Sequence, residues 1–277
     1  MRKNWTLLVG ISLVSLLVIC TLFANWISPH SPLEDFRGLE NLSPSFESRD
    51  GKYFLLGTDT LGRDLLSRLI YGARYCLLMG CVTVAIAGFI GIPLGMLAGS
   101  HTRLDAVISK ATDIVMSFPA VLIALVVVSI LGPGLFNVII AVALTSIPSF
   151  IRLTRSQVKL EFRKDYVQAA ECLGVGRIRL LSLHIFPNIV PSLLVLSSLS
   201  LGTAILESAG LSFLNLGVTP PAPEWGSMIR TGMETFLSSN PWVSTFAGLC
   251  IFLNVLAFNL IGDALRDRLD PALRGKV

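Results

Sequence analysis

Long uncharged runs, each bounded by charged segments, constrain this chain more than any other feature. The runs cover residues 6–27, 75–102, 114–151, 180–206 and 235–261. About 20 apolar residues cross a hydrocarbon core of about 30 Å, and a backbone in lipid must satisfy its hydrogen bonds within a helix or a closed barrel. The runs lack the period-two alternation of barrel strands. The pattern therefore predicts an all-α, polytopic membrane protein.

Two of the runs need closer reading. The run 114–151 is too long for one span, and the Leu-Gly-Pro-Gly turn signal at residues 131–134 predicts two helices in a hairpin. In the next run, Pro187 and Pro191 occur early, so we expect the fifth span to start near Ile189. The chain is thus expected to have six transmembrane helices.

Composition excludes several classes of protein. Hydrophobic residues make up 53% of the chain and charged residues 14%, with a mean hydropathy of +0.72, whereas soluble domains have about 25% charged residues. A soluble enzyme, a disordered chain and a disulfide-rich secreted module are therefore excluded. The first run exceeds the apolar region of about 7–15 residues of a signal peptide and lacks a small-residue cleavage site, so we expect an uncleaved anchor.

The distribution of basic residues predicts the orientation. Most of the 22 Lys and Arg residues fall in segments that lie on the inner side if the N-terminus is cytoplasmic. The net charge of +4 is then a topology signal rather than a nucleic-acid footprint. We expect a multi-pass protein of the cell membrane with cytoplasmic N- and C-termini.

Residues that could carry chemistry are scarce. The chain has no P-loop and no catalytic constellation, its three His are scattered, and its five Cys form no CxxC pair. We expect no catalytic residue, no metal site and no cofactor bound by this chain. Asp113, Glu207 and Asp263 are expected at helix ends that water reaches, so no buried proton or ion relay is predicted. A transporter of this kind would draw its energy from a partner.

Glycine recurs in the second span at Gly88, Gly91, Gly95 and Gly99. The last three follow one another at four-residue spacing and therefore line one face of a helix. This stripe predicts that a neighbouring helix packs closely there, and it says little about cargo.

The loop between the fourth and fifth spans is the most informative segment. Residues 152–173 read as a polar helix rich in Arg and Lys, which Gly174 and Gly176 then end. The stretch 165–174, Asp-Tyr-Val-Gln-Ala-Ala-Glu-Cys-Leu-Gly, is followed by Ile-Phe-Pro at 185–187. It resembles the signature of the permease subunits of binding-protein-dependent ABC importers, whose Glu-Ala-Ala, three residues, Gly and Ile-x-Pro form a cytoplasmic coupling loop.

That resemblance implies that a short helix docks into a groove of an ATPase subunit, a helix-in-groove mode of recognition. The implied ATPase-coupling residues are Gln168, Ala169, Ala170, Gly174, Ile185 and Pro187. Gln168 stands where the family usually has Glu, so this position lacks the charge for an ion pair. The alternative from the residues alone is an ordinary solvated basic loop.

Three further motifs resemble the dipeptide, oligopeptide and nickel branch of these permeases. Their expected structural residues are Gly57, Thr58, Asp59, Gly62, Arg63 and Asp64 before the core, Gly210, Gly217, Trp225 and Gly226 in an outer loop, and Asp263 in the tail. Asp59 is a plausible N-cap of an amphipathic helix over residues 61–70, on the outer membrane surface or against the bundle. Glu207 and Glu224 are expected on the outer side, either simply solvated or receiving a binding protein or a cation.

The resemblance implies a type I ABC importer permease fold with three parts: an anchor and extracytoplasmic segment at 1–74, a permease core at 75–263 that contains the coupling loop 152–187, and a cytoplasmic tail at 264–277. It implies that the chain is not an enzyme. The implied partners are a second permease subunit, ATP-binding subunits that hold ATP and Mg²⁺, an extracytoplasmic substrate-binding protein and membrane lipid, with no nucleic acid. A membrane enzyme or a proton-coupled carrier would need the catalytic cluster or buried carboxylates that the chain lacks, and a structural anchor would need no such loop.

The last hundred residues resemble nickel-type permeases of this branch most closely. This resemblance implies nickel as the cargo, carried as a small chelate because the spans offer no set of nickel ligands. A di- or oligopeptide cargo is the alternative.

Overall fold

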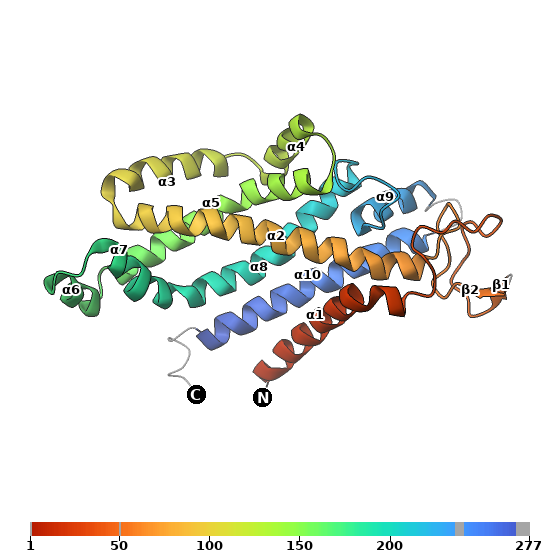
Figure 1. Cartoon of the computed structure of the whole chain (residues 1–277), viewed down its shortest axis with the longest axis horizontal. Coiled ribbons are helices and arrows are strands. Elements are labelled where there is room, and N and C mark those ends of the chain that lie inside the picture. Colours follow the sequence, from red (N-terminus) through yellow and green to blue (C-terminus); the bar gives the residue numbers. More distant parts are fainter. Residues whose placement is uncertain (1, 50, 236–240, 270–277) are drawn as a thin grey trace.

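The computed structural model describes residues 2–49, 51–235 and 241–269. In this part the chain is mostly helical, and residues 28–49 and 51–64 form the longest region without a helix (Figure 1). The elements are α1 Arg2–Ile27, β1 Ser48–Arg49, β2 Lys52–Tyr53, α2 Leu65–Ser100, α3 Thr102–Met116, α4 Ala120–Leu131, α5 Leu135–Glu161, α6 Asp165–Cys172, α7 Arg177–Arg179, the π-helix η1 Leu180–Ile185, α8 Phe186–Phe213, α9 Trp225–Thr235 and α10 Trp242–Leu269. The two short strands form an antiparallel hairpin.

Five described helices are long and apolar enough to cross a membrane. They are Trp5–Ile27, Leu65–Ser100, Leu135–Glu161, Arg177–Phe213 and Trp242–Arg268. The pair α3 and α4 makes a sixth span if it is counted as one, although its two halves are bent by 88°. The prediction of an all-α membrane protein is therefore confirmed, and the predicted six spans agree with the structure if the bent pair α3–α4 is counted as the third.

The break between α3 and α4 falls at Phe118 and Pro119. Proline has no N–H to donate, and it forces the residue before it out of the helical region. The expectation of one straight helix from residue 114 to the 131–134 turn was wrong for this reason. The turn itself is confirmed, since α4 ends at Leu131 and α5 begins at Leu135.

Helix α2 begins ten residues before the uncharged run that predicted it, at Leu65. Asp64 is its N-cap and accepts a hydrogen bond from Ser67 N at 2.9 Å, so the expectation that Asp59 caps this helix was wrong. The predicted amphipathic helix is the first part of α2. Its buried Leu65 and Leu69 pack against the bundle, which was one of the two expected positions.

Two other boundaries differ from expectation. Helix α5 continues to Glu161, so the first half of the expected polar loop helix belongs to a span and only α6 is separate. The fifth span begins at Arg177 rather than near Ile189, because α7, the π-helix η1 and α8 follow one another without a break, so that Pro187 lies inside the span just after the π-helical turn. The expected sixth span, in the fifth uncharged run at 235–261, corresponds to α10, which starts at Trp242; residues 236–240 of that run and 270–277 of the expected tail lie outside the described residues.

The glycine stripe of α2 packs against α5, with which α2 lies side by side (Figure 1). A Cβ atom on Gly91 would lie 2.6 Å from the Cβ of Phe150, and one on Gly95 would lie 2.5 Å from the Cβ of Thr154. The predicted close approach is therefore confirmed. Nearer α6, Asp105 of α3 pairs with Arg155 and, at 2.5 Å, with Lys159 of α5, which fastens α3 along the same helix.

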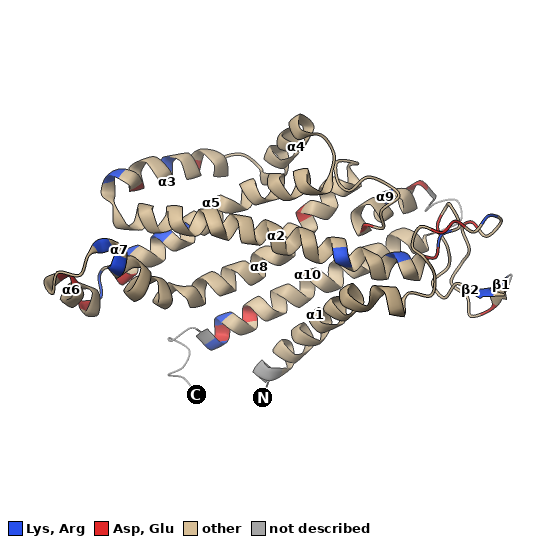
Figure 2. Cartoon of the chain, in the orientation of Figure 1, with Lys and Arg blue, Asp and Glu red and all other residues tan. Residues whose placement is uncertain are grey.

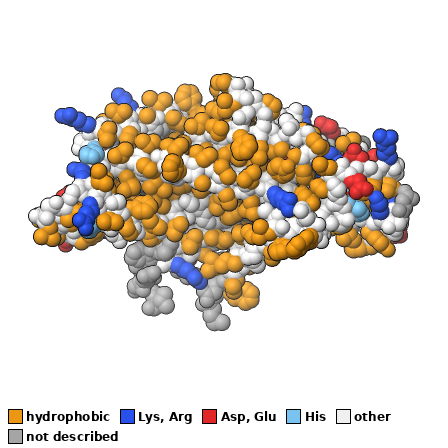
Figure 3. All heavy atoms as spheres, in the orientation of Figure 1, with side chains coloured by type: hydrophobic (Ala, Val, Ile, Leu, Met, Phe, Trp, Pro, Cys, Tyr) orange, Lys and Arg blue, Asp and Glu red, His pale blue; other side chains and the backbone are white. Residues whose placement is uncertain are grey.

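The bundle has two ends, here called the α6 end and the hairpin end, where β1 and β2 lie (Figure 1). Charged residues gather mainly toward these ends, and the visible face between them is largely hydrophobic (Figures 2 and 3). Helix α1 starts, and helix α10 ends, on the side of the bundle toward α6 (Figure 1). This distribution is that of a protein whose middle section lies in lipid.

Candidate functional site

The α6 end is built on a small hydrophobic core. Val167 and Ala170 of α6 are buried against a cluster that includes Val158 of α5 and Leu180 and Ile185 at the start of the fifth span. The opposite face of α6 is exposed. The helix is thus seated on the ends of two membrane helices and presents one face outward.

Gly174 ends α6 in the left-handed region, with φ of +76°. Val175 N donates to Ala170 O at 3.1 Å and Gly174 N donates to Glu171 O at 2.9 Å, which together form a Schellman cap. No atom lies within 4 Å of a Cβ built on Gly174, so glycine is favoured there by backbone conformation and not by crowding.

The loop residues named from the sequence divide into two groups. Gln168, Ala169, Gly174 and Pro187 are exposed, whereas Ala170 and Ile185 are buried and hold the segment in place. The exposed group shares the surface with Leu173 and Ile178, whose side chains are each 85% exposed. Sequence analysis assigned neither residue a coupling role, although Ile178, which lies between Arg177 and Arg179, is a visible signal.

A polar network that sequence analysis also missed connects α6 to both spans. Glu161 at the end of α5 is buried and accepts hydrogen bonds from Lys164 Nζ and Tyr166 Oη, each at 2.5 Å. The Tyr166 oxygen accepts a hydrogen bond from Asn188 Nδ2 of α8 at 3.0 Å. Burial and the Glu161 carboxylate raise the pKa of Tyr166 to about 12, so the phenol keeps its proton at neutral pH. These side chains therefore link α6 to the end of α5 and to α8.

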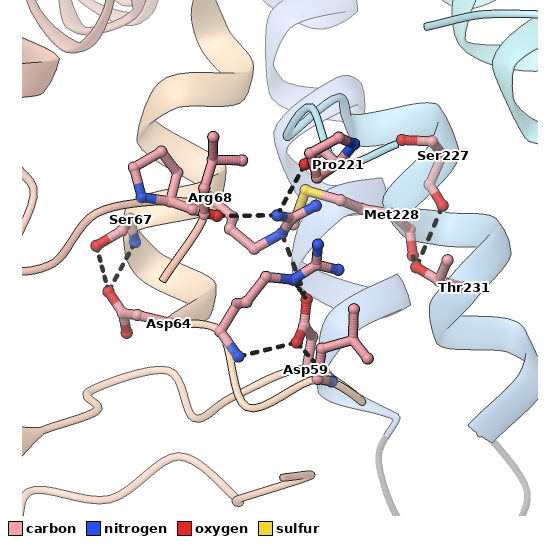
Figure 4. Close-up of polar contacts among 12 residues, drawn as sticks. Asp59, Asp64, Ser67, Arg68, Pro221, Ser227, Met228 and Thr231 are labelled. Atoms are coloured by element: carbon pink, nitrogen blue, oxygen red, sulfur yellow. Dashed lines mark hydrogen bonds and ion pairs between the residues drawn. The ribbon is translucent and has the colours of Figure 1, made fainter. Parts of the chain in front are cut away.

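At the hairpin end, Asp59 organises the turn before α2. Its carboxylate accepts from the backbone N–H groups of Leu61 and Arg63 at 2.9 Å each and from Arg63 Nε at 2.7 Å, and Arg68 Nε lies 3.5 Å away (Figure 4). Asp59, Arg63 and Asp64 are all buried. The turn is therefore a fixed structural unit rather than a solvated loop.

This turn meets the outer-loop motif, which lies far away in the sequence. Arg68 Nη1 donates to Pro221 O at 3.3 Å across 153 positions, and Trp225 Nε1 donates to Leu69 O at 3.0 Å across 156 positions (Figure 4 for the first contact). Two motifs found separately in the sequence thus form one junction that joins α2 to the start of α9.

The other expected motif positions have varied surroundings. Gly57 and Gly62 take positive φ in the turn before α2, and Thr58 accepts from Leu42 N at 2.9 Å. Gly217 and Gly226 have neighbours so close that a Cβ would collide with Ser212 and Ala209. Gly210 and Asp263 are exposed on α8 and α10.

Glu224 caps helix α9 and is only 2% exposed. Its two carboxylate oxygens accept from Gly226 N and Ser227 N at 2.8 Å each. Burial raises the pKa of Glu224, and these two donors oppose the rise. The expectation of a solvated Glu224 was wrong, because the cap requires the side chain to fold back onto the helix.

Glu207 lies within α8, and not at the helix end where it was expected. It is half-buried at the edge of a cavity of about 310 Å³ between α5, α8 and the α3–α4 bend. The lining comprises Val115, Met116, Phe118, Ala120, Ile123, Thr145, Ser146, Ser149, Ser200, Thr203 and Glu207. One wall is therefore apolar and the other carries hydroxyl and carboxylate oxygens.

The described residues hold no group of three or more His, Cys, Asp or Glu that could bind a metal ion. The five cysteines are free thiols. The arrangement is that of a polytopic membrane protein with an exposed short helix at one end, a hydrogen-bonded junction at the other and a partly polar cavity between helices.

Comparisons with known proteins agree with this class. The family described as "Binding-protein-dependent transport system inner membrane component" matches residues 91–275. The chain is 47% identical to the di/tripeptide transport system permease protein DppC of Pseudomonas aeruginosa, over 96% of this chain and 88% of that protein. It is 43% identical to the dipeptide transport system permease protein DppC of Escherichia coli K12, over 99% of this chain and 91% of that protein.

A solved structure shares the fold. The inward-facing MetNI methionine ABC transporter matches with a TM-score of 0.62 and 18% identity, covering 74% of this chain and 98% of that chain. The chain therefore belongs to the inner-membrane permease subunits of binding-protein-dependent ABC importers and has the type I importer fold. It is a pore subunit and not an enzyme, and ATP hydrolysis belongs to partner subunits. Permeases of this family work with ATP-binding subunits and a substrate-binding protein.

Proposed function

We propose that this chain forms half of the pore of an importer for dipeptides and other short peptides. The observation that carries the proposal is its identity of 47% and 43% to di/tripeptide and dipeptide permeases over nearly the whole chain. These relatives favour the peptide alternative over the nickel cargo that the last hundred residues suggested. The cavity also fits a peptide better, because it offers oxygen acceptors and an apolar wall, whereas nickel favours imidazole among protein ligands.

The test is uptake of a radiolabelled dipeptide by cells that lack the gene and by the same cells carrying it on a plasmid. Uptake should fall to background on deletion and return on complementation, while uptake of radiolabelled nickel stays unchanged. Loss of nickel uptake with intact peptide uptake would refute the peptide assignment and restore nickel as the cargo.

The proposed mechanism is alternating access driven from the α6 end. ATP and Mg²⁺ bind to the partner subunits, whose closure moves α6 as a docked rigid body. The exposed face with Gln168, Ala169 and Leu173 would enter a groove of the ATPase. The network of Glu161, Tyr166 and Asn188 supports this role, because it passes a displacement of α6 to α5 and α8. A second permease subunit would complete the pore, and the binding protein would deliver cargo at the hairpin end.

The proposed orientation places the α6 end and both termini in the cytoplasm. It is supported by the basic residues of this end, which include Arg163, Lys164, Arg177 and Arg179. Cys172 at the end of α6 is exposed and provides a native reporter. A membrane-impermeant maleimide should label Cys172 in inside-out vesicles without the ATPase subunits, and not in intact spheroplasts. The Cys172→Ser variant gives the background, and labelling in spheroplasts would reverse the orientation.

A further inference from the structure

The half-buried carboxylate of Glu207 faces a cavity of about 310 Å³ and has no cationic neighbour in its lining. No ion pair of Glu207 occurs within residues 2–49, 51–235 and 241–269, and its polar neighbour there is Thr145, whose hydroxyl donates to Val142 O. Ionisable groups inside membrane helices are costly, and they usually face a partner or a passage for cargo. Glu207 is therefore a half-buried carboxylate whose cavity lining contains no cation to balance its charge.

The spacing of the polar residues makes the site continuous. Ser200, Thr203 and Glu207 follow one another on one face of α8, and Thr145 and Ser149 lie on one face of α5. Both faces line the same cavity. Opposite them, the α3–α4 bend contributes an apolar wall with Phe118, whose side chain is 59% exposed.

Three of the five hydroxyl groups in the lining are already used as donors within their own helices. Thr145 donates to Val142 O at 2.9 Å, Ser146 donates to the same carbonyl at 2.9 Å, and Thr203 donates to Leu199 O at 3.0 Å. Their remaining capacity is that of acceptors, as is the whole capacity of the ionised carboxylate of Glu207. The cavity thus suits a ligand group rich in donors and positively charged.

We propose that Glu207 binds the α-ammonium group of the peptide as the peptide passes through the pore. This inference rests on the proposed peptide cargo. A primary ammonium has three donors and one positive charge, which match the carboxylate and the surrounding hydroxyl oxygens. The apolar wall at the α3–α4 bend accommodates the first side chain. A peptide carboxylate is disfavoured here, because it would meet acceptors and a like charge.

The test uses the whole transporter, purified through a tag on this chain with its second permease subunit and ATPase subunits, and reconstituted in liposomes with its binding protein. Dipeptide uptake and ATP hydrolysis are measured together, at saturating binding protein. Glu207→Gln keeps the size of the side chain and removes its charge. It should lower the number of peptides imported per ATP by about tenfold, as expected for loss of a hydrogen bond to a charged group.

Two further variants separate recognition from structure. Glu207→Asp keeps the charge and should retain part of the uptake, while Lys110→Gln, which removes a charge from an exposed site of α3, should leave it unchanged. Stimulated ATP hydrolysis should stay within about twofold in all three variants. If the number of peptides imported per ATP is unchanged in Glu207→Gln, this inference is overturned and the proposed peptide cargo is not. Loss of the second permease subunit from Glu207→Gln complexes also overturns it, because Glu207 would then serve assembly. A wild-type transporter that imports no peptide overturns the proposed function and this inference with it.

Discussion

Replacing Ala169 with arginine is expected to reduce peptide uptake about tenfold or more while the chain stays inserted and assembled. Ala169 lies on the exposed face of α6, so a long charged side chain there can extend into solvent. In the proposed complex the same face lies in an ATPase groove, where overfilling costs about 1–3 kcal/mol, and each 1.4 kcal/mol is a factor of ten in binding. Uptake and ATP hydrolysis in reconstituted liposomes measure the effect.

The control for this prediction is Ala169→Ser, which adds one small atom and should behave as the wild type does.

A second pair of variants tests the geometry of α6 itself. Gly174→Ala forces a side chain onto a residue with φ of +76°, whereas Gly176→Ala falls at an ordinary φ of −63° with open space around it. Gly174→Ala should therefore impair uptake and Gly176→Ala should not. Full activity of Ala169→Arg would show that α6 is not the docking surface.

Replacing Gly95 with alanine is expected to destabilise the bundle, although alanine is the better helix former. The new Cβ would lie 2.5 Å from the Cβ of Thr154 and 2.8 Å from the carbonyl oxygen of Ile151. These atoms belong to or adjoin the backbone of α5. The close contacts can therefore be relieved only if α2 and α5 move apart. Overpacking of this kind costs about 1–3 kcal/mol, and each kcal/mol lowers the melting temperature by roughly 2–4 °C in a chain of this size.

Gly88 on the same helix provides the matched control. A Cβ there would lie 3.7 Å from its nearest neighbours, Ile92 and Phe150, which is ordinary contact. Both substitutions gain helix propensity of about 1 kcal/mol, so the difference between them isolates the packing cost. The melting temperature in detergent should be lower for Gly95→Ala than for Gly88→Ala. Equal values would mean that α2 and α5 do not approach as closely as the structure has them.

The sequence predicted which segments of the chain form the candidate sites, but not which residues contact one another across them. The loop around α6 and the motifs at residues 57–64 and 210–226 were found as separate stretches, because each has its own short-range pattern. The contacts of Arg68 with Pro221 and of Tyr166 with Asn188 were not foreseen, since they join residues 153 and 22 positions apart. Glu207 was noticed but misplaced, because the end of an uncharged run was taken for the end of a helix.

The sequence by itself determined that the chain is helical, that it crosses the membrane about six times, where α4 turns into α5 and which face of α2 packs closely. These properties follow from hydrophobic length, glycine spacing and turn residues, all of which act within one segment. Only the tertiary structure decided the bend between α3 and α4, the seating of α6 on α5 and the start of the fifth span, the junction of α2 with α9, and the cavity at Glu207. Each of these depends on which helices become neighbours, and that is settled by the packing of whole faces against one another rather than by any local pattern.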